Sequence, residues 1–380
     1  MQQLLQQLPQ QIVNGISVGS IYALIAVGYT MVYGVLQLIN FAHGDVFMVG
    51  AIVSYYAATR RIAPTMPWWL HVVIIAALLL GLAVQRVISG NWRRALGRVL
   101  PFIILYLALV PGLFIVSAIS RWPRLAGTSW TMAGFALLVA LLACGALGFT
   151  IERLAYRPLR NKPRINSLIT AIGISLLLEF GGQNPAVFGP TPQAYPQVVP
   201  GDVEPLFRLH LHFGHLIDSV VVLTRVDGLV IGTTLFLMIV LTWIVLKTRT
   251  GLALRAVSYR FDTSALMGID IDRVVSVTFV LGSCLAAVAG MLYAVKYPKV
   301  EPLMGLLPGI KAFVAAVFGG IGNIAGAVVG ALILGLVEAL VVGFLNNGSQ
   351  YRDAVAFVIL IIILLVKPSG LLGKHVVEKV

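Results

Sequence analysis

Long apolar stretches alternate along this chain with short polar connections. A helix needs roughly 20 apolar residues to cross the hydrocarbon core of a bilayer. The stretches that approach this length lie at residues 12–33, 41–59, 68–88, 101–120, 131–151, 165–180, 228–246, 274–295, 324–345 and 351–366. A further stretch, 306–321, is shorter and glycine-rich, which is typical of a short crossing or a re-entrant half-helix. The pattern predicts an all-α polytopic membrane protein with about ten or eleven spans, forming one transmembrane domain over residues 1–380.

The composition indicates that lipid is the solvent of this chain. Hydrophobic residues make up 59% of it and charged residues only 11%, whereas a soluble domain carries about 25% charged residues. The net charge of +13 would favour nucleic acid as the partner of a soluble protein. Here the basic residues lie mainly in short connections between apolar stretches, where they set the topology. We therefore expect membrane lipid, and no nucleic acid, around this protein.

Basic residues gather in three connections, which orient the spans. With three more in the C-terminal tail, the connections at 86–98, 153–164 and 247–273 hold 17 of the 27 Lys and Arg residues. All of these regions fall on one side if 306–321 crosses the membrane, and the positive-inside rule makes that side cytoplasmic. The proline-rich residues 181–227 then form a periplasmic loop without a long helix. Residues 247–272 form a cytoplasmic loop.

The cytoplasmic loop contains a basic, helix-compatible stretch between two glycines, GLALRAVSYRFDTSALMG at 251–268. Arg255 lies beside an apolar face made by Leu252, Ala256 and Tyr259. A short exposed helix of this kind suits the docking of a soluble partner protein. The charge bias of cytoplasmic loops explains its arginines equally well, so the pattern alone leaves both explanations open.

Polar residues and glycines interrupt two of the apolar stretches, 41–59 and 306–321. Ionisable residues within spans are functional candidates, and interrupted helices are the best sequence indication of a translocation path. The candidates for the path are Asn40, His43, Asp45, Lys311, Gly319, Gly320, Gly322 and Glu338. The first three are also typical of a helix N-terminus at the membrane interface. For Lys311, an ion pair with Glu338 and snorkelling from a helix end are the structural alternatives.

Enzyme motifs are absent from the sequence. None of the eight lysines stands in the G-x-x-x-x-G-K-[ST] context of a P-loop, so ATP hydrolysis through that motif is not expected. H-E-x-x-H and G-x-S-x-G are missing as well. The histidines His210, His212 and His215 lack the companion ligands of a zinc site. We expect no catalytic residue, no metal and no cofactor.

Several long motifs occur in an order that resembles the branched-chain amino-acid ABC permeases, in particular their H-type subunit. The motifs are NGISVGSIYALIAVGYTMVYGVLQLINFAHGDVFMVG at 14–50, TIERLAYRPLR at 150–160, the loop at 255–269, GIKAFVAAVFGGIGNIAGAVVGALILGLVEA at 309–339 and KPSGLLG at 367–373. The resemblance covers roughly residues 10–60 and 140–375.

This resemblance implies a permease subunit that translocates leucine, isoleucine and valine across the bacterial inner membrane. It implies a second, M-type permease subunit, two ABC ATPase subunits that hydrolyse ATP, and a periplasmic substrate-binding protein. It also makes the stretch at 251–268 the coupling loop that meets the ATPase. The docking residues implied are Gly251, Arg255, Ala256, Asp262, Ala265 and Gly268.

Two features depart from the family pattern. Residues 62–124 resemble an inserted pair of helices around a basic loop, and the coupling loop reads SYRFD where a more acidic stretch is expected. Two alternatives stay open. A related ABC permease for urea, short amides or another small solute would share these motifs. A secondary transporter or channel would need coupling-ion residues facing a midplane cavity, and only Asp45, Glu179, Lys311 and Glu338 are candidates.

Overall fold

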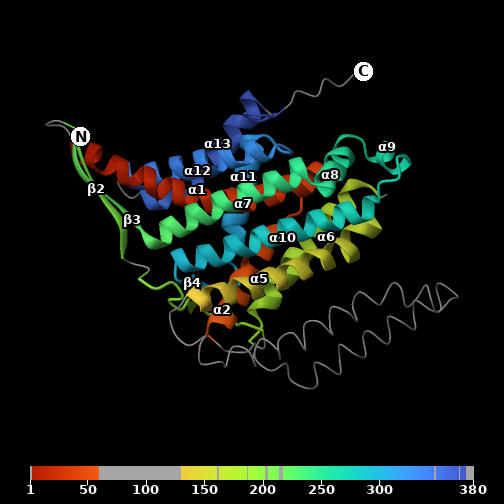
Figure 1. The fold of residues 1–380 in the computed structure, drawn as a ribbon, viewed down its shortest axis with the longest axis horizontal. Coiled ribbons are helices and arrows are strands. Elements are labelled where there is room, and N and C mark those ends of the chain that lie inside the picture. Colours follow the sequence, from red (N-terminus) through yellow and green to blue (C-terminus); the bar gives the residue numbers. More distant parts are fainter. Residues whose placement is uncertain are drawn as a thin grey trace.

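The computed structural model describes residues 2–59, 130–160, 162–185, 187–201, 204–213, 217–345, 348–367 and 369–373. This part of the chain is a bundle of long helices with a β-hairpin at one end (Figure 1). The long helices are α1 (Gln2–Leu36), α2 (His43–Thr59), α5 (Trp130–Ile151), α6 (Arg164–Gln183), α7 (Arg225–Lys247), α10 (Ile271–Lys296), α11 (Leu306–Gly319), α12 (Ile324–Phe344) and α13 (Gly348–Val366). The predicted helix pair at 62–124 lies outside the described residues and stays a prediction.

The apolar stretches that lie within the described residues coincide with these helices. Seven of the described helices are long and apolar enough to span a membrane, and α2 and α11 are shorter, with 17 and 14 residues. The prediction of a polytopic all-α membrane protein with a short segment near 306–322 is therefore confirmed. α1 extends further toward the N-terminus than the predicted span at 12–33.

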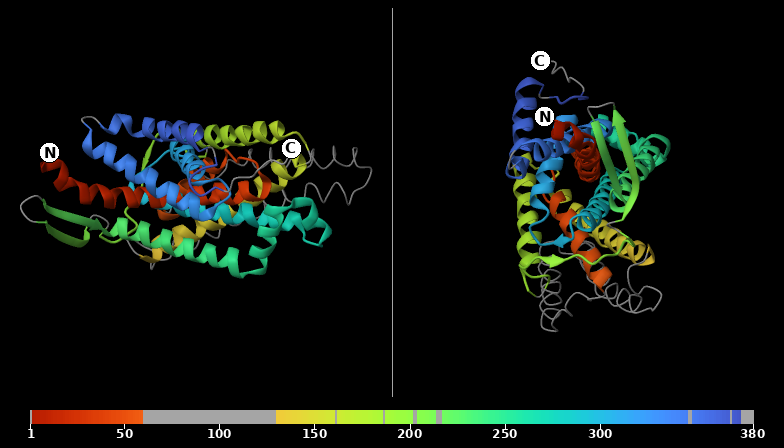
Figure 2. Two further views of the ribbon diagram at one scale, coloured as in Figure 1. Left: turned by 90° about the horizontal axis from the view of Figure 1, so that it is seen from above. Right: turned by 90° about the vertical axis from the view of Figure 1, so that its left-hand side faces the viewer.

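α1 is the central helix of the bundle (Figure 2). Every residue from Ser17 to Val32 is buried. A Cβ atom added at Gly19 would lie 2.9 Å from the carbonyl oxygen of Ala331, so glycine lets α1 approach the backbone of α12. The glycines at 322, 326 and 330 have the four-residue spacing of a helix-packing face. Gly322, however, lies in the turn before α12, with a φ of 91°, and only Gly326 and Gly330 are within the helix.

The region expected to be a periplasmic loop contains strands that the sequence did not predict. β2 (Pro205–Phe213) pairs with β3 (Ile217–Thr224) as a hairpin, and β1 (Gln193–Ala194) pairs with β4 (Lys299–Val300). The side chain of Gln10 hydrogen-bonds the backbone of Val222 in both directions, at 2.8 and 3.1 Å. These contacts put the hairpin, the start of α1 and the end of α10 on one side of the bundle.

The opposite end carries α8 (Arg249–Tyr259) and α9 (Phe261–Leu266), which lie across α7 from the hairpin (Figure 1). The C-terminal segment joins this end: the N–H groups of Leu371 and Leu372 donate to the carbonyls of Phe318 and Gly319 at 2.8 and 3.0 Å. The segment from β4 through α11 therefore runs from the hairpin side of the bundle to the side of the C-terminal segment. This arrangement fits the short crossing better than a re-entrant loop.

Two single cysteines should report this sidedness. In a background without Cys144 and Cys284, Arg208→Cys in the hairpin should react with a membrane-impermeant thiol reagent from the periplasmic side. Tyr259→Cys, which replaces a side chain that is 86% exposed, should react only from the cytoplasmic side. Labelling is measured in spheroplasts and in inverted vesicles. Reaction of both cysteines from the same side would contradict the topology.

Candidate functional site

α2 begins in the interior of the bundle instead of at its end. α1 ends before Gln37, which adopts the left-handed conformation with a φ of 53°, and residues 38–42 then run without helical structure. His43, in the first turn of α2, lies against Gly28 of α1 and Gly282 of α10. At 1.5 Å per residue, Gly282 is about 17 Å along α10 from its first residue. The break between α1 and α2 therefore lies at depth.

α11 begins at the same place. A Cβ atom on Gly44 would lie 2.8 Å from the carbonyl oxygen of Gly305 and 3.1 Å from the Cα of Gly309, so only glycine permits this approach. With 14 residues, α11 is about 21 Å long, against roughly 30 Å for the hydrocarbon core. The fold thus joins the starts of the two interrupted segments, and we call this contact the α2–α11 junction. Helix N-termini carry partial positive charge and suit carboxylate groups.

Aromatic rings surround the α2–α11 junction. The ring of Tyr29 lies 4.7 Å from that of His43 and 6.0 Å from that of Phe313, centroid to centroid, in edge-to-face geometry. Phe41, in the irregular segment, lies 6.1 Å from Phe313. The Nε2 atom of His43 has no hydrogen-bond partner among the described residues. The three aromatic rings at this place are those of Tyr29, Phe41 and Phe313, and the polar groups among these side chains are the His43 imidazole and the Tyr29 hydroxyl.

The other polar residues at the start of α2 bind neighbouring helices. The hydroxyl of Tyr156, in the π-helix η2 (Glu152–Tyr156), donates to Asn40 Oδ1 at 2.9 Å. The hydroxyl of Ser175 on α6 donates to Asp45, and Glu179 lies next to the same carboxyl. Asn40 and Asp45 are both buried. Their side chains therefore fasten α2 to η2 and α6, which a simple capping role does not explain.

Lys311 and Glu338 form the ion pair that the sequence left open. Lys311 Nζ lies 3.1 Å from Glu338 Oε1 and 2.7 Å from Asp353 Oδ1. Arg352 Nε donates to the same oxygen of Glu338, and the hydroxyl of Tyr22 donates to its other oxygen at 3.0 Å. The side chains of Lys311 and Glu338 are only 6% and 3% exposed. The two cations thus offset the two carboxylates. We call this group of Lys311, Arg352, Glu338 and Asp353 the Lys311 cluster.

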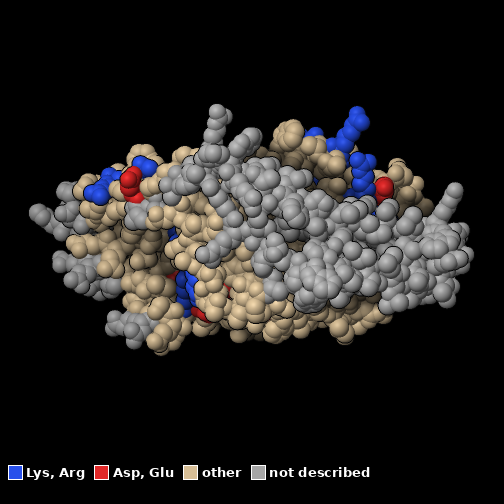
Figure 3. Space-filling model, turned by 90° about the horizontal axis from the view of Figure 1, so that it is seen from below, with Lys and Arg blue, Asp and Glu red and all other residues tan. Residues whose placement is uncertain are grey.

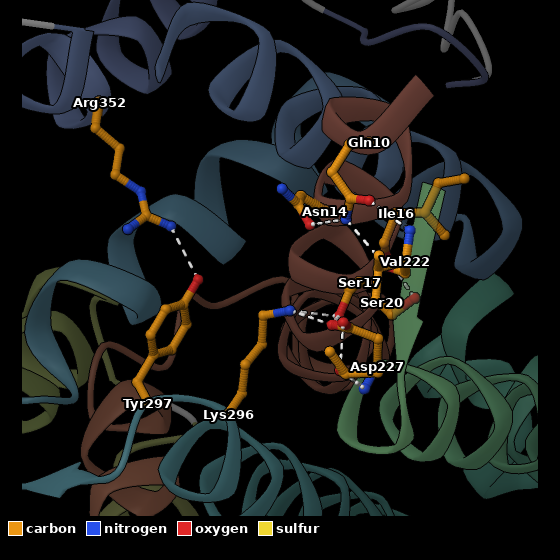
Figure 4. Close-up of polar contacts among 11 residues, drawn as sticks. Gln10, Asn14, Ile16, Ser17, Ser20, Val222, Asp227, Lys296, Tyr297 and Arg352 are labelled. Carbon is orange, nitrogen blue, oxygen red and sulfur yellow. Dashed lines mark hydrogen bonds and ion pairs between the residues drawn. The ribbon is translucent and has the colours of Figure 1, made fainter. Parts of the chain in front are cut away.

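A second buried ion pair joins three helices (Figure 4). Lys296 Nζ lies 2.5 Å from Asp227 Oδ1 and donates to Ser17 Oγ at 2.7 Å. The hydroxyl of Ser17 also donates to Asp227 at 2.7 Å. These contacts link the end of α10 and the start of α7 to α1. Figure 3 shows basic and acidic side chains together inside a hollow of an otherwise uncharged part of the surface.

The predicted docking residues lie on or beside α8 and α9. Arg255, Ala265 and Gly268 are exposed and Ala256 is half-buried, whereas the side chain of Asp262 is outside the described part. Gly251 is buried in the corner between α7 and α8, where an added Cβ would lie 2.2 Å from the carbonyl oxygen of Ile244. The exposed apolar side chains of this end are Leu252, Tyr259, Leu266 and Met267.

Three glycines predicted for the path lie at the other end of α11, away from the α2–α11 junction. A Cβ atom on Gly319 would lie 2.0 Å from the carbonyl oxygen of Gly326, and one on Gly320 2.6 Å from the amide nitrogen of Gly373. Gly320 and Gly322 have φ values of 109° and 91°. These glycines make the corner between α11, α12 and the C-terminal segment.

The sequence matches the family described as branched-chain amino acid transport system, permease component, over residues 11–119 and 110–364. The chain belongs to this family. It is 35% identical to the high-affinity branched-chain amino acid transport system permease protein LivH of Escherichia coli K12, over 98% of this chain and 97% of LivH. It is 36% identical to the permease protein BraD of Pseudomonas aeruginosa, with the same coverage of both chains. No solved structure matches.

Membership confirms the resemblance that the motifs predicted and sets aside the secondary transporter or channel. The permease is a multi-pass membrane protein. Asp227, Lys296 and Arg352 were missed as site residues because each lies near the end of an apolar stretch, where charged residues are common. Asp227 is in the first turn of α7 and Lys296 in the last turn of α10. The signal that could have found the ion pair is that Asp227 and Lys296 carry opposite charges at helix ends on the same side of the membrane.

Proposed function

We propose that this permease passes leucine, isoleucine and valine across the bacterial inner membrane as one subunit of an ATP-driven importer. The observation that carries the proposal is the match, over 98% of the chain, to relatives named for high-affinity branched-chain amino acid transport. The α2–α11 junction supports it. Two helix N-termini suit the carboxylate of an amino acid, and the rings of Phe41 and Phe313 suit an apolar side chain. Asn40, His43, Asp45, Lys311 and Glu338 are the polar residues proposed for this path.

The proposal assigns ATP hydrolysis to two ABC ATPase subunits, one of which docks on α8 and α9 of this permease. A second, M-type permease and a periplasmic substrate-binding protein complete the importer. In this scheme residues 1–380 form one permease domain, 181–227 face the periplasm and 247–272 form the cytoplasmic coupling loop. The exposed Tyr259 and Leu266, which are 86% and 87% exposed, support docking, because large apolar side chains outside a membrane usually mark an interface.

Uptake of labelled leucine tests the substrate. The permease and the subunits encoded beside it are produced in cells that lack their own branched-chain amino-acid import. Leucine should enter, and unlabelled isoleucine and valine should compete with it. Competition by urea or acetamide, without competition by isoleucine, would contradict the proposal and indicate a permease for urea or short amides.

Arg255→Glu tests the docking assignment. Arg255 is exposed on α8, and reversing its charge should weaken an interface that the arginine helps to steer. Leucine uptake should fall about tenfold or more, which corresponds to about 1.4 kcal/mol, while the permease still inserts in the membrane. Arg208→Glu in the hairpin is the matched control, because it reverses a charge on the opposite side. Normal uptake and normal ATPase pull-down with Arg255→Glu would contradict docking at α8.

A further inference from the structure

A π-helix connects the docking helices with the interrupted start of α2. The first contact is between Phe261, the first residue of α9, and Arg160, whose guanidinium carbon lies 5.8 Å from the ring centroid. Two cavities, of about 480 and 340 Å³, adjoin this contact, and both residues line each of them. The contact between Phe261 and Arg160 therefore lies between two cavities, which leave α9 room to move relative to the bundle.

Arg160 in turn holds η2. Its Nη2 lies 3.0 Å from Glu152 Oε1 and its Nη1 2.7 Å from Asp272 Oδ1, in the first turn of α10. The Glu152 side chain is fully buried, and its other oxygen accepts from the hydroxyl of Ser276 at 2.6 Å. Charge-assisted pairs of this kind are strong and directional. A displacement of Arg160 must therefore move Glu152 or break a buried ion pair.

Glu152 and Tyr156 are the two ends of η2. The Tyr156 ring packs 5.2 Å from that of Phe279, and its hydroxyl donates to Asn40 Oδ1 at 2.9 Å. The backbone carbonyl of Asn40 accepts from the N–H of His43 at 3.1 Å, which begins α2. One π turn thus touches the docking side through Glu152 and the irregular segment through Tyr156.

We propose that η2 transmits movement of the docked α9 to the start of α2, with Arg160 and Tyr156 as positioning residues. The inference rests on the proposed function, since it assumes an ATPase bound at α8 and α9. A π turn closes its hydrogen bond one residue later than an α turn, and it occurs mostly as a short bulge, frequently at functional sites. Shifting such a bulge changes the positions of Glu152 and Tyr156 without unfolding α5. That is the kind of discrete element through which coupling between sites is carried.

The decisive measurement is leucine transported per ATP hydrolysed, in proteoliposomes that contain the whole importer. Tyr156→Phe removes one buried hydrogen bond and should lower this ratio about fivefold. Arg160→Gln should lower it further, and Arg160→Lys should restore part of it. Arg153→Gln is the matched control: it lies in the same π turn, but its guanidinium lies over Phe149 and takes no part in the link. ATPase pull-down should be unchanged in all of these variants.

Two results would overturn the inference. One is an unchanged ratio in both Tyr156→Phe and Arg160→Gln. The other is full additivity of the two losses in the double variant, since residues of one link should not act independently. A purely structural role belongs to the first case, because it predicts lower protein levels with an unaltered ratio.

A second readout does not depend on the substrate. Phe41→Cys, in a background without Cys144 and Cys284, should change its rate of thiol labelling when the importer is trapped with ATP. In a Tyr156→Phe background that change should disappear, and its persistence would refute the link. A different result is that the importer shows this labelling change with Phe41→Cys when Tyr156 is intact, and yet carries no leucine without any substitution. In that case the substrate assignment fails while the link stands.

Discussion

A Glu338→Gln permease is expected to unfold at a markedly lower temperature than the unaltered protein. Glu338 accepts from Lys311, Arg352 and Tyr22 in a buried position. Removing its charge leaves two cations with Asp353 as the remaining carboxylate of the Lys311 cluster. Breaking a buried ion pair by removing one partner costs about 3–5 kcal/mol, and here Asp353 alone remains to offset the two cations. Thermal unfolding of the detergent-purified permease measures the effect.

Glu301→Gln is the matched control. Glu301 pairs with Lys299 at 3.0 Å, but the two side chains are 33% and 59% exposed, and exposed pairs contribute about 0–1 kcal/mol. A double variant, Lys311→Gln with Glu338→Gln, removes one charge of each sign and should recover part of the lost stability. Equal unfolding temperatures for Glu338→Gln and Glu301→Gln would show that the Lys311 cluster does not stabilise the fold.

The helices of this permease could be predicted from the sequence because their cause is local. An apolar stretch of sufficient length can satisfy its backbone in lipid only as a helix. The short stretch at 306–321 was recognised for the same reason, and α11 has 14 residues. Its course across the bundle could not be decided from the sequence, because that depends on contacts with β4 and with the C-terminal segment.

The hairpin was not predicted, although the sequence contains the two-residue period of a strand, because the prolines around it indicated a loop. In the part of the chain that became β2, Leu209 and Leu211 alternate with His210 and His212, which is the two-residue period of a strand. Of the three histidines that suggested a metal hypothesis, His210 and His212 are alternate positions of β2, paired in register with Val220 and Asp218, and His215 lies outside the described residues.

The polar contacts of the candidate site could not be predicted, since they join residues far apart in the chain. Lys296 and Asp227 are separated by 69 positions, and Tyr156 and Asn40 by 116. One sequence shows which residues are ionisable within apolar stretches, and this identified Lys311 and Glu338. It does not show which helices are neighbours. Which helices are neighbours is known only from the folded structure, in which α1 lies at the centre of the bundle.

Gly44→Val is expected to abolish most leucine uptake. Gly44 meets the backbone of α11, and an added Cβ would lie 2.8 Å from the carbonyl oxygen of Gly305. The neighbouring atoms belong to the backbone, so no side chain can rotate to make room. Overpacking of this kind costs about 1–3 kcal/mol, and here it would push apart the two helix starts proposed to bind the amino acid. Uptake should fall about tenfold or more, since about 1.4 kcal/mol already gives a factor of ten.

The same substitution at Gly134 separates this effect from a general effect of valine in a membrane helix. Gly134 is in α5, and a Cβ atom there would meet no described atom within 4 Å, so Gly134→Val should transport leucine normally. Gly44→Ala should give an intermediate loss, because it adds the Cβ without the two methyl groups. Both Gly44 variants should still reach the membrane and bind the ATPase, because the atoms that an added Cβ at Gly44 would meet belong to Gly305 and Gly309 and not to α8 or α9. Normal uptake by Gly44→Val would remove the α2–α11 junction from the path and leave it as a packing contact.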